Sequence, residues 1–504
     1  MAINQSSPGV VFQERDLTSV TQVSSPTTGL FAGPFMEGPI EEIVNINNER
    51  ELVKYFGEPT DNNFEHFFTA ASFLDYGGLL YTVRVDDDAL KNACDAGTAP
   101  KIKNFDDYEA NHEAATNTWK WAARYAGSKG NSIGVFVTDA GADQIAVVPA
   151  PGSGNEFEFV ADEAVTAASG AAGKVFKYSI VLTLTSIVGS FTPGQATTIT
   201  ISSSNETVNV LAYDALNKKL EIELPTGGVT GIIADAQVVT QGTNTAAIAS
   251  SGIERRLYIG LDKGSVEFAA TDSIEDTGSN AAVIESVRNE YLEREYMPGE
   301  RWVRAAQRPG ESTYASNSGG RNDEVHILVV DVDGGITGVQ GSILERFIGA
   351  SKASDAKNSV GESIYYVNLI KETSNFIWWG EHETSFFAAT GTSADGDWGL
   401  TAANRQFNLI RTSAGSINGV TNEVAIGSKN GSSAYYRLAN GADYALTGSE
   451  FSVTPGNIET AYELADDPES TLVDFILTGP AGATESAAIS KINMLVNLAT
   501  ERQD

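Results

Sequence analysis

Hydrophobic and polar positions near the N-terminus alternate between strand-like runs and segments with helical spacing. The expected elements are strands over residues 43–46 and 79–85 and helices over residues 49–56 and 65–76. Asn48 is placed to cap the first helix, and Gly57 is placed to end it. This succession of helix, glycine break and β-branched run predicts an α/β layer over residues 29–90.

The pattern changes between residues 141 and 251. Thr, Val, Ala, Gly and Ser dominate there, and turns such as Pro225–Gly228 separate short alternating runs. The expected strands cover residues 156–160, 175–185, 197–201, 208–212 and 220–224. Because the α/β sequence pattern returns after this stretch, the stretch is predicted to be an inserted antiparallel β domain, either a sandwich or a barrel.

The rest of the chain mixes both patterns. Further helices are expected over 108–126, 280–294, 342–347, 458–464 and 485–502, and further strands over 133–137, 302–304, 325–332, 363–370, 375–379 and 472–477. The last helix carries Ile489, Ile492, Val496 and Ala499 on one face. The predicted fold class is α/β and α+β multidomain: an α/β core, the inserted β-sandwich or barrel and an extended N-terminal arm.

Six segments follow from these patterns. They are an extended arm (1–28), the first part of a core α/β domain (29–90), a connecting helix–strand segment (91–140), the inserted β domain (141–251), a middle α/β domain (252–400) and the second part of the core (401–504). A strand, a glycine turn and a helix normally lead to another parallel strand. We therefore expect the natural polypeptide to continue past Asp504 into a further C-terminal domain.

The arm has too few apolar residues to fold alone. Its apolar centre, Val10, Val11 and Phe12, follows a Pro8-Gly9 turn and can add a strand to the edge of another sheet by main-chain pairing. The alternative is a frayed terminus with one local strand.

Composition narrows the class of function. The net charge is −33, from 33 basic and 66 acidic residues. Such a chain repels nucleic acid and anionic membranes, so neither is expected as a partner. One cysteine and four scattered histidines favour neither a disulfide nor a metal site, and no cofactor is expected. No apolar run is long enough for membrane insertion, and no secretory signal is visible, so we expect folding in a cytoplasm.

Four motifs invite a chemical interpretation, and each has a plainer one. Asp331–Gly334 opens like a calcium loop but lacks its later ligands. Gly479–Ser486 sits where phosphate would bind but lacks the lysine of a P-loop. Glu381–Ser385 has no accompanying nucleophile elbow, and Trp378–Trp379 would place at least one ring in a core. Nothing catalytic remains, so an enzyme is not expected.

Several segments occur in an order that resembles one known family. They are Ser7–Glu14, Gly29–Gly33, Glu37–Pro39, Phe56–Pro59, Phe73–Gly78, Tyr81–Val85, Ala123–Asn131, Ala305–Gly310, Asn322–His326 and Ala465–Pro468. Together they resemble the contractile tail sheath proteins of myophages. The match is most specific in the N-terminal block, whereas residues 141–251 match nothing in particular.

The resemblance implies a structural virion protein of a contractile tail. Such subunits stack as hexameric rings in a helical lattice around the tail tube protein, between baseplate and tail terminator proteins, and contract during genome ejection. The implied location is the virion tail, assembled in the host cytoplasm. By the same analogy Pro8, Gly9, Val10, Val11 and Phe12 form an inter-subunit arm.

Three alternatives stay open. One is the sheath of a related contractile injection system. Another is a carbohydrate-binding virion protein that uses the β insertion, with Trp378–Trp379 as a stacking platform. The third is a hydrolase, which only Glu381–Ser385 would support.

Overall fold

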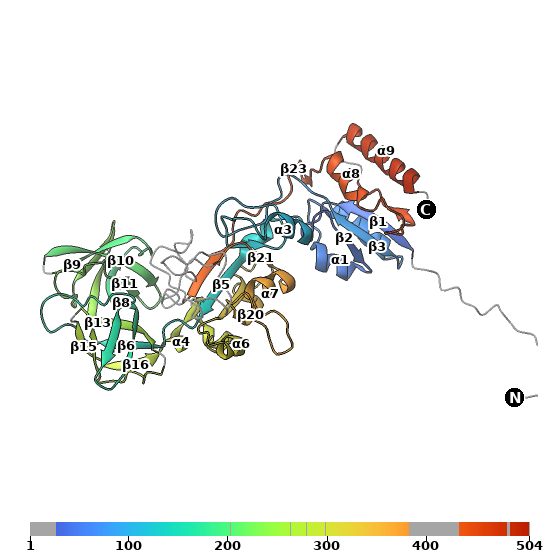
Figure 1. The fold of residues 1–504 in the computed structure, drawn as a ribbon. Coiled ribbons are helices and arrows are strands. Elements are labelled where there is room, and N and C mark those ends of the chain that lie inside the picture. Colours follow the sequence, from blue (N-terminus) through green and yellow to red (C-terminus); the bar gives the residue numbers. More distant parts are fainter. Residues whose placement is uncertain are drawn as a thin grey trace, which may run out of the picture. The chain divides into compact units, whose positions relative to one another are not determined.

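The computed structural model describes residues 27–201, 203–262, 264–278, 280–297, 299–382, 433–480 and 484–502 (Figure 1). These residues form two compact units. Residues 27–88 and 444–502, from the two ends of the chain, build a terminal unit, and the remainder builds a central unit. The predicted arm residues Pro8, Gly9, Val10, Val11 and Phe12 lie outside the described residues, and the six-segment division stays a prediction.

The terminal unit is built on a four-stranded mixed sheet. Its elements are β1 (Thr28–Gly33), β2 (Ile43–Ile46), α1 (Glu49–Phe56), α2 (Phe64–Leu74), β3 (Leu79–Arg84), β23 (Leu446–Thr447), β24 (Glu450–Phe451), α8 (Pro455–Glu463), β25 (Phe475–Ile476) and α9 (Glu485–Arg502). The strand order is β2-β3-β1-β25, with β1 parallel to both neighbours. As predicted, Asn48 caps α1 by accepting a hydrogen bond from the Glu51 N–H, and Gly57 follows its end.

Strand β1 buries side chains on both faces of this sheet. Leu30 packs in a cluster with α8 and α9, whereas Phe31 packs in a second cluster with α1 and α2. Successive side chains of a strand point to opposite faces, so one short apolar run supplies two cores. The result is a three-layer arrangement of helices, sheet and helices (Figure 1).

Two buried cations fix helix α9 to the rest of the terminal unit. Lys491 Nζ donates to the Pro480 carbonyl at 2.9 Å, and the Arg502 guanidinium donates to the carbonyls of Ala465 and Thr471. Burial lowers the pKa of Lys491 to about 8. The helix is therefore held at both ends by side-chain hydrogen bonds to loop carbonyls.

The central unit contains an antiparallel sheet of order β20-β19-β5-β22. Its elements outside the barrel region are α3 (Phe105–Asn111), β4 (Trp121–Ala123), a 3-10 turn (Ser128–Ser132), β5 (Ile133–Asp139), α4 (Glu290–Glu293), β17 (Glu295–Met297), β18 (Glu300–Arg301), α5 (Trp302–Ala305), α6 (Thr313–Asn317), β19 (Glu324–Asp331), β20 (Ser342–Ser351), α7 (Tyr366–Thr373), β21 (Ile377–Trp379) and β22 (Ser433–Arg437). Strands β5 and β19, predicted from apolar runs, are buried almost throughout.

The inserted β domain is a closed barrel. Its ring is β8-β11-β10-β9-β12-β13, closed by a direct pairing of β13 with β8. The strands of this region are β6 (Gln144–Val148), β7 (Ala164–Ala167), β8 (Ala172–Val188), β9 (Ala196–Ile201), β10 (Ser204–Asp214), β11 (Lys219–Glu223), β12 (Val238–Gln241), β13 (Asn244–Leu261), β14 (Ser273–Asp276), β15 (Ala281–Val283) and β16 (Ser286–Asn289). The predicted mixed α/β fold with an antiparallel β insertion is confirmed, and the insertion is a barrel rather than a sandwich.

One predicted strand of the barrel region, residues 156–160, is absent, and its first residue forms a buried ion pair. Glu156 and Arg255 are both buried, and their side chains are joined by two hydrogen bonds of 2.7 and 2.9 Å. The Glu156 carboxylate also accepts from the Ile233 N–H. Residues 156–160 run without strand pairing, and Glu156 at their start places its carboxylate against the Arg255 guanidinium.

The helix predicted over residues 108–126 is wrong. Helix α3 ends at Asn111, and residues 121–123 instead form β4, which pairs with β21. The intervening residues include Thr116 and Thr118, which are weak helix formers. The Asn117 side chain donates to the carbonyls of His112 and Gly380, which stabilises a turn at this point.

Other predicted elements are wrong either because the segment pairs with another strand or because its buried residues have helical rather than strand spacing. Residues 342–347, predicted as helix, belong to β20 because they pair with β19. Within 280–294 only Glu290–Glu293 is helical, since the preceding strands pair with β14 and β6. Residues 302–304 and most of 363–370 are helical rather than extended, with Tyr366, Val367 and Ile370 buried at helical spacing.

The buried pair of Glu156 and Arg255 yields a stability prediction. Replacing Glu156 by Ala leaves the buried guanidinium without its counter-ion, so unfolding in urea should become easier by about 3–5 kcal/mol. Circular dichroism gives the midpoint. Glu275→Ala, at an exposed position of β14, should change stability by less than about 0.5 kcal/mol. Equal midpoints for the two variants would contradict the assigned role of the pair.

The depressed pKa of Lys491 yields a pH prediction. The unfolded chain holds this proton up to about pH 10.5, whereas the folded chain loses it near pH 8. Between these values the unfolded state binds more protons, so folding stability rises with pH by at most about 1.4 kcal/mol per unit. Urea unfolding at pH 7.5–10 should show this rise in the wild type and not in Lys491→Met. Lys54→Met, at an exposed lysine of α1, should retain it.

Candidate assembly interface

Strand β25 is the edge of the terminal sheet. It pairs with β1 on one side, and no described strand pairs with its other side. Asp474 fixes it in place: its carboxylate accepts from the Thr28 N–H at 2.7 Å and from the Thr28 hydroxyl at 2.9 Å. An edge strand presents backbone donors and acceptors to whatever approaches it.

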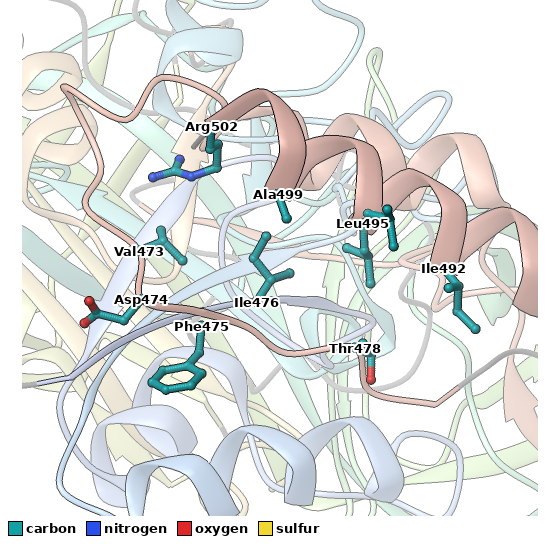
Figure 2. Close-up of a pocket in the computed structure, with 10 residues that line it drawn as sticks. Val473, Asp474, Phe475, Ile476, Thr478, Ile492, Leu495, Ala499 and Arg502 are labelled. Atoms are coloured by element: carbon teal, nitrogen blue, oxygen red, sulfur yellow. The ribbon is translucent and has the colours of Figure 1, made fainter. Parts of the chain in front are cut away.

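A groove of about 330 Å³ runs between β25 and helix α9 (Figure 2). Its lining is mainly apolar and comprises Val473, Asp474, Phe475, Ile476, Thr478, Ile492, Leu495, Val496, Ala499 and Arg502. Figure 2 shows Ile476 and Ala499 facing each other across the groove, with the Arg502 guanidinium at one end. The groove therefore combines an apolar floor with an adjacent strand edge.

Large apolar side chains remain exposed along this groove. Phe475, Ile492 and Val496 keep 56%, 53% and 58% of their surface exposed, and Leu472 and Ile489 nearby are similar. A contiguous apolar surface of this kind is typical of an interaction site. The groove and its exposed rim are called the β25–α9 groove below.

The sequence identified the apolar face of α9 without identifying its role. Ile489, Ile492, Val496 and Ala499 share a face as predicted, yet Leu495 and Leu498 are the apolar side chains that enter the core. Residues 472–477 were expected as a buried strand, whereas the strand is short and Phe475 is more than half exposed. The exposed surface thus combines the apolar face of α9 with the segment 472–477, whose burial was overestimated.

The motifs with a possible chemical interpretation have structural partners. Asp331 accepts from the N–H groups of Ile336 and Thr337, so the Asp331–Gly334 motif is a strand-ending turn. His382 contacts the Tyr366 hydroxyl, and burial, with a smaller effect of Lys120, lowers its pKa to about 4. Ser385 lies outside the described residues.

Trp378 offers no open stacking platform. Trp378 is 1% exposed. The Tyr108 ring stacks on it with 4.2 Å between the ring centres, and the Arg124 guanidinium carbon lies 3.4 Å from the centre of the Trp378 ring. Its indole N–H donates to the Arg124 carbonyl. A sugar therefore has no access to this ring.

Within the described part of the chain, no helix is long and apolar enough to cross a membrane. No three side chains of His, Cys, Asp or Glu come together there as a metal site would require.

No protein-family model matches the chain. Curated relatives do match, and three of them carry the name tail sheath protein. The relative from Salmonella phage ViI is 28% identical over 291 residues, which cover 55% of this chain and 43% of the relative. Those from Enterobacteria phage T4 and Vibrio phage KVP40 are 40% and 36% identical over 88 and 93 residues, or 17% and 18% of this chain and 13% of each relative.

The aligned part of the chain spans less than half the length of each curated relative. Two solved structures of sheath tail proteins also align. The one from Listeria innocua is 12% identical, covers 46% of this chain and 35% of its own, and has a TM-score of 0.16. The one from Desulfitobacterium hafniense is 11% identical, covers 48% of this chain and 39% of its own, and has a TM-score of 0.15. On the curated relatives, the resemblance seen in the sequence is confirmed: this chain is a homologue of the tail sheath proteins of several myophages.

Proposed function

We propose that this chain is a structural subunit of a contractile phage tail sheath. It polymerises as stacked hexameric rings around the tail tube protein, between baseplate and tail terminator proteins, and contracts to drive the tube through the host envelope. The observation that carries the proposal is the shared name of its curated relatives, all tail sheath proteins. The role is mechanical rather than enzymatic, and the protein acts in the virion tail after assembly in the host cytoplasm.

Within this function, the β25–α9 groove receives the N-terminal arm of a neighbouring copy. The strand edge supplies main-chain pairing for Val10, Val11 and Phe12, and the apolar floor accepts their side chains. Pro8 and Gly9 set where the added strand begins. The arm precedes Thr28, whose backbone and hydroxyl both bond to Asp474 beside the groove.

Chain length permits this exchange between copies. Residues 13–27 separate the apolar centre of the arm from β1, and fifteen extended residues reach roughly 50 Å. Each main-chain hydrogen bond contributes only about 0.5–1.5 kcal/mol net. Repetition of a few such bonds over a lattice makes the whole assembly durable through multivalency.

Contraction needs no nucleotide in this scheme. Rigid-body movement between two packings of neighbouring subunits supplies the work, as in other bistable interfaces. The exchanged arm keeps neighbouring copies connected while they rotate.

The arm proposal predicts a selective loss of polymerisation. Deleting residues 1–20 should leave a folded monomer, because this segment has too few apolar residues to build a core. Val11→Pro should act in the same direction by removing a backbone donor from the added strand. Ser24→Pro is the matched control outside the apolar centre. Light scattering and negative-stain microscopy measure assembly, and normal sheaths from the truncated chain would overturn the arm's role.

A cysteine pair distinguishes exchange from self-occupancy of the groove. Val11→Cys combined with Thr478→Cys should give dimers and higher oligomers on a non-reducing gel if the arm belongs to a neighbour. A crosslinked monomer would show that the arm folds back on its own groove. Val11→Cys with Leu216→Cys, on a barrel turn remote in sequence, is the control that should give no ladder.

The charge of the subunit predicts how assembly depends on salt. Copies with a net charge of −33 repel one another, and the Debye length falls from about 30 Å at 0.01 M to about 10 Å at 0.1 M salt. Polymerisation measured by light scattering should therefore increase with ionic strength over this range. A decrease would indicate that ion pairs, rather than main-chain and apolar contacts, hold the copies together.

A further inference from the structure

The chain crosses between the central sheet and the barrel twice, and the crossings lie side by side. Residues 140–143 lead from β5 to β6, and residues 289–294 lead back from β16 through α4. Asn289 is paired with Gln144 across the β16–β6 ladder, so the two crossings begin at one point. These two segments are called the stem.

Two arginines supply hydrogen-bond donors to the carbonyls of the first crossing. Arg294 donates to the carbonyls of Asp139 and Ala140 at 2.6 and 3.0 Å. Arg308 donates to the carbonyls of Ala140 at 2.9 Å and of Gly141 at 3.3 Å. A chain that leaves one sheet for another loses its ladder partners, and buried carbonyls without donors are costly.

Arg294 is fully used in this position. It is 0% exposed, and besides the two carbonyls it donates to the Thr138 hydroxyl at 2.9 Å and to the Glu290 carboxylate. A guanidinium has five N–H donors in a fixed planar fork. The contacts engage all of them, so the side chain ties the second crossing to the first with no spare donor.

Both ends of the first crossing are fixed as well. At the sheet end, Lys352 Nζ lies 2.7 Å from the Asp139 carboxylate, and both side chains are 0% exposed. At the barrel end, Asp143 accepts from Arg308 at 2.5 Å and from the Leu261 N–H of β13 at 2.8 Å. The first crossing is thus bonded at its sheet end to Lys352, which directly follows β20, and at its barrel end to Leu261 of β13.

We propose that the stem is a rigid joint, in which Arg294 and Arg308 make the barrel and the central sheet move as one body. Hinges are a few loop or element-terminal residues that absorb backbone rotation. Here the Asp139 carbonyl at the end of β5 and the stem carbonyls of Ala140 and Gly141 each have a side-chain donor. The function of these arginines is positional: they set the orientation of the barrel relative to the sheet. This inference does not depend on the proposed sheath function.

The test measures the distance between a spin label on the barrel and one on the sheet side of the full chain. The side chains of Leu216 and Val360 are 89% and 76% exposed, so cysteines introduced there (Leu216→Cys and Val360→Cys) can be labelled. The native thiol does not compete, because Cys94 is buried and burial, with the nearby Asp95, raises its pKa to about 11. Pulsed electron paramagnetic resonance should give one narrow distance distribution.

Arg294→Lys keeps the charge but cannot form the fork, so the distribution should become at least about twofold wider. Amides 140–143 should exchange about tenfold faster in the same variant, while amides of the barrel strands keep their protection. Arg304→Ala, at an exposed arginine of α5, is the matched control and should match the wild type.

Arg308→Ala supplies an independent test, because the Arg308 side chain is 31% exposed and its loss leaves the buried network of Arg294 intact. It should widen the distribution too, and it decides the matter if Arg294→Lys does not fold. A broad distribution in the wild type, or distributions as narrow as the wild type in the folded arginine variants, would overturn the rigid joint.

Discussion

Backbone hydrogen bonding at strand edges organises both units of this chain, because a buried N–H or C=O group without a partner is costly. The barrel meets this requirement by closure, since β13 pairs with β8 and completes the ring. In the terminal unit, β1 is paired on both sides, by β3 and by a strand about 450 residues later in the sequence. Only with both edges satisfied can this strand be buried on both faces.

Strand pairing stops both in the stem and at the outer side of β25, and the structure treats these two places differently. In the stem, arginine side chains replace the missing ladder partners, and the carbonyls stay buried. At β25 no described strand pairs with the outer edge, and apolar side chains stay exposed beside it. A satisfied edge is suited to stiffness within a subunit, whereas an open edge is suited to contact between subunits.

Local signals sufficed where one segment determines its own structure. The Asn48 cap and Gly57 fixed α1, and the bounds of α9 agree with the pattern over residues 485–502. Prediction failed where a distant partner decides. Residues 342–347 are extended because β19 pairs with them, although their pattern also suits a helix. Fold class was therefore accessible, while many element types in the central unit were not.

In the candidate site too, sequence periodicity predicted the local structure but not the contacts made with other parts of the chain. Periodicity identified the apolar face of α9 but carries no information on what covers it, and in the structure Ile492 and Val496 on that face are more than half exposed. The stem arginines gave no signal at all, since nothing in the sequence distinguishes Arg294 from the exposed Arg304. A buried guanidinium is recognised only when the acceptors around it are placed.

The distribution of charge explains why an open apolar edge suits a chain of this composition. Among the described residues, the buried basic side chains are Arg84, Lys177, Arg255, Arg256, Arg294, Lys352, Lys491 and Arg502, and the buried acidic ones are Asp86, Asp87, Asp95, Asp139, Glu156, Glu221, Glu290, Asp323 and Asp331. Their charges nearly cancel, so the surplus behind the net charge of −33 lies elsewhere in the chain. Identical copies with such surfaces cannot match each acid with a base across a contact. Main-chain pairing and apolar burial are insensitive to that surplus, and the β25–α9 groove offers both.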